Sequence, residues 1–246
     1  MTSPDSTTSA SAPEPAAAPL RSTRLVLVRH AVTAQTGPIL SGRTPGIELS
    51  DRGREQAAAV ATRLATLPVA AVYASPIERT TQTAEHIARH HDLPVLPLPG
   101  VLEADYGDWT GGTIADLAKT DLWKTVQRAP SRARFPNGES LVQMQVRMVS
   151  ALETVVGEHT GSTIVVVSHA DPIKSAIAHY CGMHLDQFQR IVVSPASVTV
   201  FDLGPHGAAL LTCNDTGDLA SLVASPEPPP AAEGSAPETE DAGAVA

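Results

Sequence analysis

The apolar runs of this chain are short, and they alternate with longer segments of helical composition. Runs rich in Val, Ile and Leu are typical of strands that are buried on both faces of a sheet. Such runs predict strands at residues 24–30, 69–75, 162–169, 197–203 and 208–214, with a weaker extended segment at 93–99. The last two strands are close enough in the chain to form a closing hairpin.

Helices are predicted between these strands, because several of the intervening segments open with residues that favour a helix start. Ser50 or Asp51 suits the cap of the first helix, and Pro76 the start of the second. The predicted helices are residues 50–67, 76–91, 114–120, 139–159 and 171–183. This alternation predicts an α/β fold, a three-layer α/β/α sandwich with a mostly parallel central sheet. Ligands bind such sheets at the carboxyl ends of the strands.

The two ends of the chain differ in composition from its centre. Residues 1–22 are mostly Ser, Thr, Ala and Pro, and residues 216–246 are rich in Pro, Ala, Glu and Gly. Such segments bury too little apolar surface to offset the entropy of ordering, so both are predicted to be disordered tails. Residues 23–215 are predicted to form a single folded domain. The net charge of −9 arises from acids near the two ends of the chain, because residues 21–214 hold 17 acids and 17 Lys or Arg and are neutral by count.

Charge and hydropathy argue against several classes of partner. The sequence has no basic stripe, which argues against nucleic-acid binding. It has no run of about 18 apolar residues, so no membrane span is expected. Cys181 and Cys213 stand in no metal-binding spacing and suit free thiols in a reducing cytoplasm, although their spacing does not exclude a disulfide. The sequence does not define an oligomeric state.

Two of the predicted strands end in a histidine. His30 follows the run LVLVR and His169 follows IVVVS, so both are predicted at the carboxyl edge of the sheet. Arg29 stands beside the first histidine, and its planar guanidinium matches phosphate oxygens in a bidentate way. Arg79 lies near the start of the helix after a third strand, where anions are favoured. Together these residues predict a phosphate site.

Five segments in this order carry a resemblance to a known family. They read LVLVRHAVT, GRTPGIELSDRGREQA, SPIERTTQTA, LEADYGDWTG and SHADPIK. Over residues 24–214 the chain resembles the histidine phosphatase superfamily, also called the phosphoglycerate mutase-like family. The segments FPNGES and GMHLDQFQRIVV are similar to those of an actinobacterial branch described as probable phosphomutases. The resemblance implies a phosphoglycerate mutase-like sandwich.

The resemblance also implies a role for each matching residue. His30 matches the histidine that becomes transiently phosphorylated. Arg29 and Arg79 match the two arginines of the phosphate pocket, and His169 matches its second histidine. Glu103 matches the proton donor.

Other positions of the pattern match less closely. Thr33 and Thr36 fall in the loop that helps to cradle phosphate, where Thr36 replaces the usual Asn. Ala31 and Ala170 stand where the family usually has Gly, and Ala170 is expected to contact substrate. Alanine is tolerated there if φ is negative, whereas a positive φ would strain the pocket by about 1 kcal/mol or more.

The expected chemistry follows from these groups. A neutral imidazole nitrogen attacks phosphorus, and guanidinium groups, with His169 if it is protonated, hold the charge of the transferred group. A carboxyl group such as Glu103 protonates the leaving oxygen and then activates water. Asp105 and Asp108 lie close enough in sequence to share that role. No metal or cofactor is required, and the expected partner is a small phosphorylated metabolite.

Three functions fit these residues. The favoured one is a phosphomonoester hydrolase; the alternatives are a phosphoglycerate-type phosphomutase and a non-enzymatic binder of phosphate ligands. A mutase usually has a longer insertion before the Glu segment, whereas here only about two dozen residues separate Arg79 from Glu103. Substrate identity is not defined. Arg128, Arg132 and Arg134 form either a solvated basic loop or an attraction for a multiply charged substrate.

Overall fold

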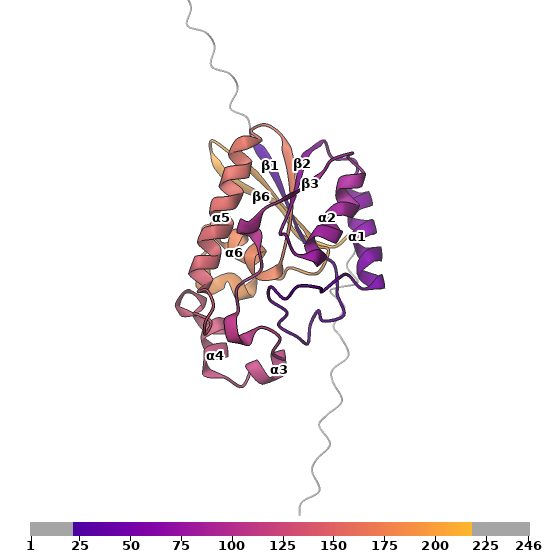
Figure 1. Cartoon of the computed structure of the whole chain (residues 1–246). Helices are drawn as coiled ribbons and strands as arrows, with labels where there is room; N and C mark the ends of the chain where they lie inside the picture. Colours follow the sequence, from indigo (N-terminus) through magenta and orange to yellow (C-terminus); the bar gives the residue numbers. More distant parts are fainter. Residues whose placement is uncertain (1–21, 218–246) are drawn as a thin grey trace, which may run out of the picture. The chain divides into compact units, whose positions relative to one another are not determined.

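The computed structural model describes residues 22–217, which contain one six-stranded sheet (Figure 1). The strands are β1 Thr23–Arg29, β2 Val69–Ala74, β3 Val95–Pro97, β4 Thr163–Ser168, β5 Val198–Gly204 and β6 Gly207–Asp215. Their order across the sheet is β3-β2-β4-β1-β5-β6. The first four in this order are parallel, and β5 and β6 continue the sheet as an antiparallel hairpin. The strands predicted from the apolar runs are therefore confirmed.

The helices are α1 Asp51–Leu64, α2 Glu78–Arg89, α3 Ile114–Leu117, α4 Asp121–Arg128, α5 Leu141–Glu158 and α6 Ala170–Tyr180. Short 3₁₀ turns occur at Pro99–Val101, Gly107–Trp109, Pro130–Arg132 and Leu185–Arg190. Ser50 caps α1, because its side chain accepts a hydrogen bond from the backbone N–H of Gly53. Ser140 caps α5 and forms a capping box with Gln143.

Two of the predicted helices differ from the structure. Pro76 lies before α2 rather than at its start, because Ile77 is the N-cap and its backbone is extended. The segment predicted as one helix at 114–120 ends at Leu117 instead. Thr120 caps the next helix, α4, by accepting a hydrogen bond of 3.2 Å from the backbone N–H of Trp123. The sequence reading missed α4, whose start depends on this threonine.

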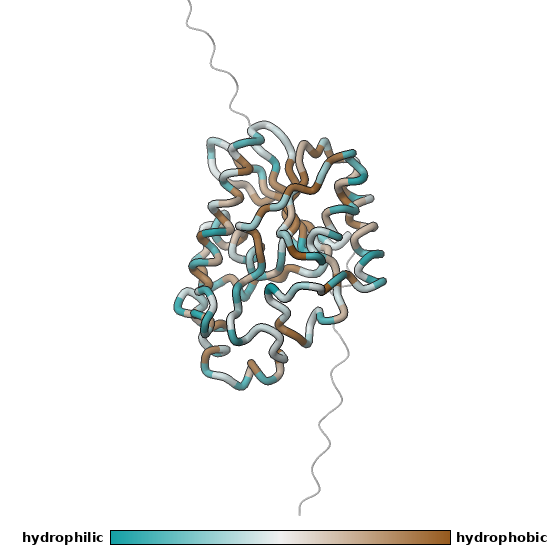
Figure 2. Tube along the Cα trace, viewed as in Figure 1, coloured by the Kyte–Doolittle hydropathy of each residue, from teal (hydrophilic) through white to brown (hydrophobic). Residues whose placement is uncertain are grey.

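Helices cover both faces of the sheet, which confirms the three-layer α/β/α sandwich. Alternate residues of β1 point to opposite faces, as the two-residue repeat of a strand requires. Val26 and Val28 pack with residues of α1 and α2, whereas Leu25 and Leu27 pack with residues of α5 and α6. Figures 1 and 2 show the two helix pairs on either side of the sheet and the hydrophobic residues concentrated along the central strands.

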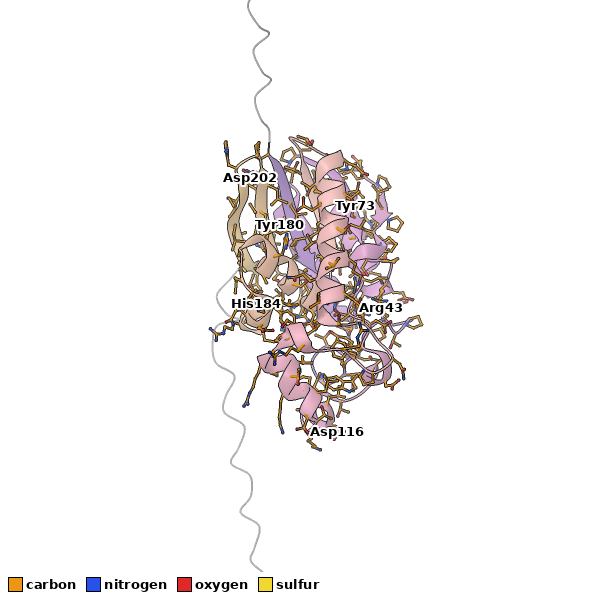
Figure 3. All side chains as sticks on the ribbon, turned by 90° about the vertical axis from the view of Figure 1, so that its left-hand side faces the viewer. Arg43, Tyr73, Asp116, Tyr180, His184 and Asp202 are labelled. Atoms are coloured by element: carbon orange, nitrogen blue, oxygen red, sulfur yellow. The ribbon has the colours of Figure 1, made fainter. Side chains whose placement is uncertain are left out.

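A third apolar cluster lies beyond the carboxyl edge of the sheet. It joins the connection that contains α3 and α4 to residues before α5 and after α6, and it includes Tyr106, Trp109, Val126, Phe135 and Phe188. In Figure 3, Asp116 on α3 lies at the bottom of the folded part of the protein and Asp202 on β5 at its top. This cluster therefore forms a separate wall beside the edge where ligands bind in such sheets.

The two predicted tails, residues 1–22 and 216–246, lie almost entirely outside the described residues. Their disorder and the domain boundaries beside them stay predictions. Between residues 22 and 217, none of the helices is both long and apolar enough to cross a membrane.

Candidate active site

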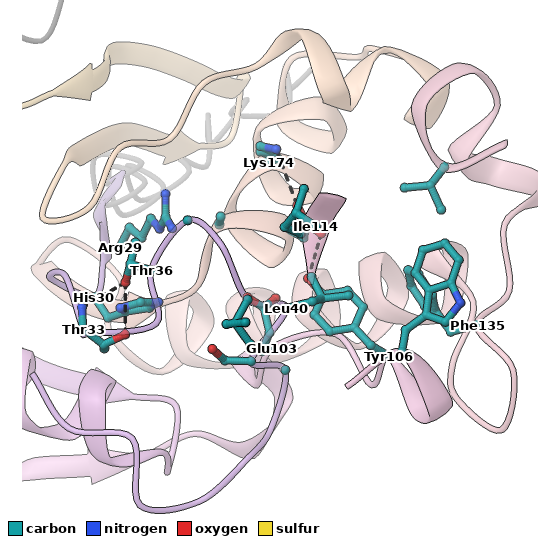
Figure 4. Close-up of a pocket in the computed structure, with 18 of the residues that line it drawn as sticks. Arg29, His30, Thr33, Thr36, Leu40, Glu103, Tyr106, Ile114, Phe135 and Lys174 are labelled. Atoms are coloured by element: carbon teal, nitrogen blue, oxygen red, sulfur yellow. Dashed lines mark hydrogen bonds and ion pairs between the residues drawn. The ribbon is translucent and has the colours of Figure 1, made fainter. Parts of the chain in front are cut away.

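A cavity of about 270 Å³ opens at the carboxyl edge of the sheet (Figure 4). Its lining includes most of the site residues predicted from the sequence: Arg29, His30, Thr33, Thr36, Arg79, Glu103 and Ala170. They come from segments far apart in the chain. The parallel register brings them together, because Arg29 at the end of β1 pairs with Ser168 at the end of β4. His30 and His169, which follow these two residues, therefore leave the sheet side by side.

His30 is neutral and presents one free ring nitrogen. Its Nδ1 lies 2.8 Å from the carbonyl oxygen of Ala31. A carbonyl oxygen can only accept, so Nδ1 carries the proton and Nε2 keeps its lone pair. Burial, with the nearby charges of Arg29 and Arg79, holds the pKa of His30 well below its ordinary value. The ring is therefore ready to act as a nucleophile.

Two guanidinium groups flank this ring, a half-buried one on Arg29 and a buried one on Arg79, and each has an unsatisfied donor. Arg29 donates from Nη1 to the carbonyl oxygen of Val193 at 2.6 Å, but its Nε has no partner among the described residues. Arg79 donates from Nη2 to the carbonyl oxygen of Gly42 at 2.7 Å, and its Nη1 likewise has no partner. Burial lowers the pKa of both groups, yet arginine remains charged in proteins. Both arginines line the cavity together with His30, and two positive charges at one end of a cavity favour a bound anion.

His169 is joined to Arg79 rather than exposed in the cavity. Its Nδ1 accepts a hydrogen bond from Nη2 of Arg79 at 3.2 Å, so Nε2 carries the proton and donates to Oγ of Ser75 at 2.8 Å. The centroid of its ring is 5.3 Å from that of His30. Burial, the neighbouring His30 and the positive charge of Arg79 hold the pKa of His169 well below its ordinary value. In this geometry His169 helps to orient the guanidinium of Arg79.

Ser75 is a buried hydroxyl that the sequence reading did not select. We expect Ser75→Ala to weaken the binding of inorganic phosphate about 3- to 10-fold, because one hydrogen bond that fixes the His169 tautomer is lost. Phosphate affinity would be measured by competitive inhibition of turnover. Ser175→Ala is the matched control, since Ser175 is an equally buried serine that bonds to Pro172 in α6. Equal weakening in both variants would contradict the role given to Ser75.

The positions that depart from the family pattern are unstrained. Neither Ala31 nor Ala170 is among the non-glycine residues with positive φ. The backbone N–H of Ala31 donates to Oγ1 of Thr83 at 3.2 Å, and Ala170 is the first residue of α6. Alanine therefore causes no backbone strain at either position. A loss of activity through such strain is not expected.

Thr33 and Thr36 form a compact turn at the cavity wall. Oγ1 of Thr36 accepts a hydrogen bond from the backbone N–H of Thr33 at 2.9 Å. The two hydroxyl groups are 3.1 Å apart. Their mutual bonding fixes the loop that follows His30.

Glu103 is a buried carboxyl group whose pKa is raised to about 7. Burial is the main cause, and the negative charge of Asp171 adds to it, while Arg79 and Arg29 act in the opposite direction. Its loop is anchored because Arg147 donates to the carbonyl oxygens of Gly100, Leu102 and Glu103 at 2.9, 2.7 and 2.9 Å. A carboxyl group with this pKa can give and take protons near neutral pH.

Several further residues of the cavity were not predicted. Asp171 lies in the first turn of α6, where its Oδ2 accepts a hydrogen bond from the hydroxyl of Tyr106 at 2.9 Å. Lys174 lies 3.5 Å from Oδ1 of Asp171 and 3.2 Å from Oε1 of Gln189. Asp171 and Lys174 belong to the SHADPIK segment. These two residues are three positions apart on a helix that begins at the site. That spacing could have identified them as neighbours of the cavity.

Asp171→Asn tests the charge beside Glu103. Removing this negative charge lowers the pKa of Glu103, because a major cause of its elevation is lost. If protonated Glu103 supports turnover, activity is lost as pH rises through its pKa, so the alkaline limb of kcat/KM moves to lower pH. The pH profile of both proteins would be recorded with one substrate, whose own ionisation then cancels. A limb that stays in place would contradict this coupling.

Other residues considered from the sequence lie away from the chemistry. Asp108 accepts hydrogen bonds from the side-chain amide of Asn137 at 3.1 and 3.0 Å, a structural role. Asp105 accepts from the backbone N–H of Gly107 at 3.1 Å. The basic cluster of Arg128, Arg132 and Arg134 is exposed and does not line the cavity. The structure thus favours the solvated loop for these arginines.

The fold, and a cavity that is lined by His30 and two arginines, are those of an enzyme of phosphoryl transfer. The chain belongs to the histidine phosphatase superfamily (branch 1), whose sequence model matches residues 25–216. It is 32% identical over 202 residues to phosphoserine phosphatase 1 of Hydrogenobacter thermophilus, covering 80% of this chain and 94% of that protein. It is 32% identical over 156 residues to phosphoglycerate mutase-like protein 4 of Arabidopsis thaliana, covering 61% and 68%.

A solved structure shows the same fold. The phosphoserine phosphatase of Entamoeba histolytica, in complex with 3-phosphoglyceric acid, matches with a TM-score of 0.73 and 27% identity, covering 79% of this chain and 98% of that one. The protein is therefore an enzyme of the phosphatase or phosphomutase class. The expected family and the phosphoglycerate mutase-like fold are confirmed.

Proposed function

We propose that this protein is a phosphomonoester hydrolase, with His30 as nucleophile and Glu103 as proton donor. The observation that carries the proposal is that a neutral ring, whose Nε2 is free, lines one cavity together with the guanidinium groups of Arg29 and Arg79. Such an arrangement binds a phosphoryl group and leaves a lone pair to attack it.

In the first step, Nε2 of His30 attacks phosphorus, and the P–N bond forms as the ester P–O bond breaks. Arg29 and Arg79 hold the charge on the three other phosphoryl oxygens. Protonated Glu103 gives its proton to the departing oxygen, so the alcohol leaves neutral. His169, fixed by Ser75, keeps Arg79 in position.

In the second step, water replaces the imidazole. The carboxylate of Glu103 takes a proton from water as its oxygen attacks phosphorus, and the P–N bond breaks. Inorganic phosphate leaves, while Nε2 regains its lone pair and Glu103 is again protonated. One buried carboxyl group with a pKa near 7 serves both steps, because it is about half protonated at neutral pH.

A phosphomutase is the second candidate, since mutase-like names occur among the relatives. A mutase of the phosphoglycerate type handles substrates with further anionic groups, which require cations besides those at the reacting phosphoryl group. Apart from Arg29 and Arg79, Lys174 is the cation among the described lining residues of the cavity, and it is already paired with Asp171. This pairing supports hydrolysis over transfer.

The direct test is to trap the intermediate. Full-length protein mixed with a ³²P-labelled phosphomonoester and quenched in alkali should carry label that is acid-labile and maps to His30. Release of inorganic phosphate from p-nitrophenyl phosphate should accompany it. A coupled assay for interconversion of 2- and 3-phosphoglycerate separates the mutase. Absence of both label and phosphate release across a broad panel of esters would reject hydrolysis.

A cytoplasmic location is part of the proposal. Cys181 and Cys213 are both exposed free thiols, which suits a reducing compartment.

A further inference from the structure

The cavity continues beyond its phosphate end into an apolar end. Figure 4 shows Phe135 at the far side of the cavity from His30, with Tyr106 between them. The apolar end is lined by Leu40, Trp109, Ile114, Trp123, Val126 and Phe135. These residues belong to or adjoin the third apolar cluster, whose open side forms the wall of the cavity. If the phosphoryl group lies at Arg29 and His30, the leaving group of the substrate extends toward this wall.

The aromatic residues of the chain are concentrated at this end. The sequence contains two Trp, three Tyr and three Phe, and both Trp with Tyr106 and Phe135 line the cavity. Trp109 and Trp123 are stacked at 6.2 Å between centroids, and Trp109 lies 5.5 Å from Phe135. Trp109 and Phe135 are only 8% and 2% exposed, so these rings are held firmly, and Trp123 is partly exposed at the edge. The result is a fixed aromatic wall that suits a flat apolar group.

The charged groups at this end are already paired. Lys174 lies 3.5 Å from Asp171 and 3.2 Å from Gln189, and its ammonium stands 5.6 Å from the centroid of the Phe188 ring. Asp171 also accepts the hydroxyl of Tyr106. A carboxylate or ammonium on the leaving group would therefore lose water without gaining a free counter-charge, which is unfavourable.

We infer that the leaving group accepted by this site is an uncharged alcohol that carries an apolar ring, which packs on the aromatic wall at Trp123. This inference rests on the proposed function and specifies its substrate class. The substrate inferred here differs from phosphoserine, whose leaving group, serine, carries an ammonium and a carboxylate.

The test uses esters whose leaving groups differ in apolar surface but not in kind. Ethyl phosphate and 2-phenylethyl phosphate both release a primary alcohol, so their intrinsic reactivity is similar. We expect kcat/KM for 2-phenylethyl phosphate to exceed that for ethyl phosphate and for phosphoserine at least about tenfold. Phosphoserine turned over as well as or better than 2-phenylethyl phosphate would overturn the inference. If the same preparation still hydrolyses p-nitrophenyl phosphate in a way that depends on His30, only the inference about the leaving group is rejected. If it does not, the proposed hydrolase function is rejected.

Trp123→Ala locates the effect. We expect its kcat/KM to fall at least about tenfold more for 2-phenylethyl phosphate than for ethyl phosphate, and Trp123→Phe to restore most of the ratio. Leu122→Ala is the matched control, because Leu122 neighbours Trp123 on α4 and packs on the same cluster without lining the cavity. An unchanged ratio in Trp123→Ala, or the same loss in Leu122→Ala, would contradict an aromatic subsite at Trp123.

Discussion

His30→Ala should lower kcat/KM for every phosphomonoester by at least about 10⁴-fold, because loss of a nucleophile leaves only binding and charge stabilisation. The ³²P label should vanish with the activity. Phosphate should still bind, since Arg29 and Arg79 still line the cavity without the imidazole. Steady-state kinetics, trapping and competitive inhibition by phosphate of the residual activity measure the three effects.

The size of the loss is informative because His30 is also buried. His30→Ala removes a ring that lies against His169, so a folding defect must be separated from lost chemistry. His30→Asn keeps a polar side chain of smaller size and serves as the second variant. Both variants should unfold cooperatively near the temperature of the unmodified protein. Substantial turnover in a folded His30→Asn protein would show that another group is the nucleophile.

Glu103→Gln should lower kcat/KM for an alkyl phosphate by about 10²- to 10⁴-fold, the range typical of general acid catalysis. The loss should be much smaller for p-nitrophenyl phosphate, since its phenolate leaves without protonation. The alkaline limb near pH 7, set by the pKa of Glu103, should disappear with the carboxyl group. Rates for both esters would be measured from about pH 5 to about pH 9, the range over which a carboxyl group of this pKa titrates.

Asp105→Asn is the control for Glu103→Gln. Asp105 is a neighbouring acid that the sequence also offered as proton donor, and it bonds to Gly107. Its replacement should leave the dependence on the leaving group unaltered. Equal losses for alkyl and aryl esters in Glu103→Gln would mean that Glu103 does not protonate the leaving oxygen.

The sequence predicted those parts of the site that depend on strand ends. His30, His169 and Arg29 follow apolar runs that are typical of buried strands, and parallel strands bring their ends to one edge. Ser75 ends another such run, yet a single serine carries no chemical signal until His169 is seen to donate to it. The carbonyl oxygen of Val193, which holds Arg29, belongs to backbone that sequence patterns do not place.

The residues at the apolar end of the cavity were missed for a different reason. Trp109 and Trp123 lie in short turns and a short helix, where the hydrophobic repeat is too brief to show which face is buried. Their contact depends on the third apolar cluster, which forms between segments that are not neighbours in the chain. The wall was thus invisible in the sequence, although its residues were present in the YGDWTG segment and beyond it.

The pairing of β1 with β4 also sets when during synthesis the enzyme can first exist. Arg29 and His30 are made early, but their strand has no parallel neighbour until Thr163–Ser168 has been made. Val193, which holds Arg29, and β5, on the other side of β1, follow later still. Closing such long loops is slow compared with forming local helices. A nascent chain therefore carries His30 long before the segments that complete its site, and activity requires synthesis to have passed β4, Val193 and β5.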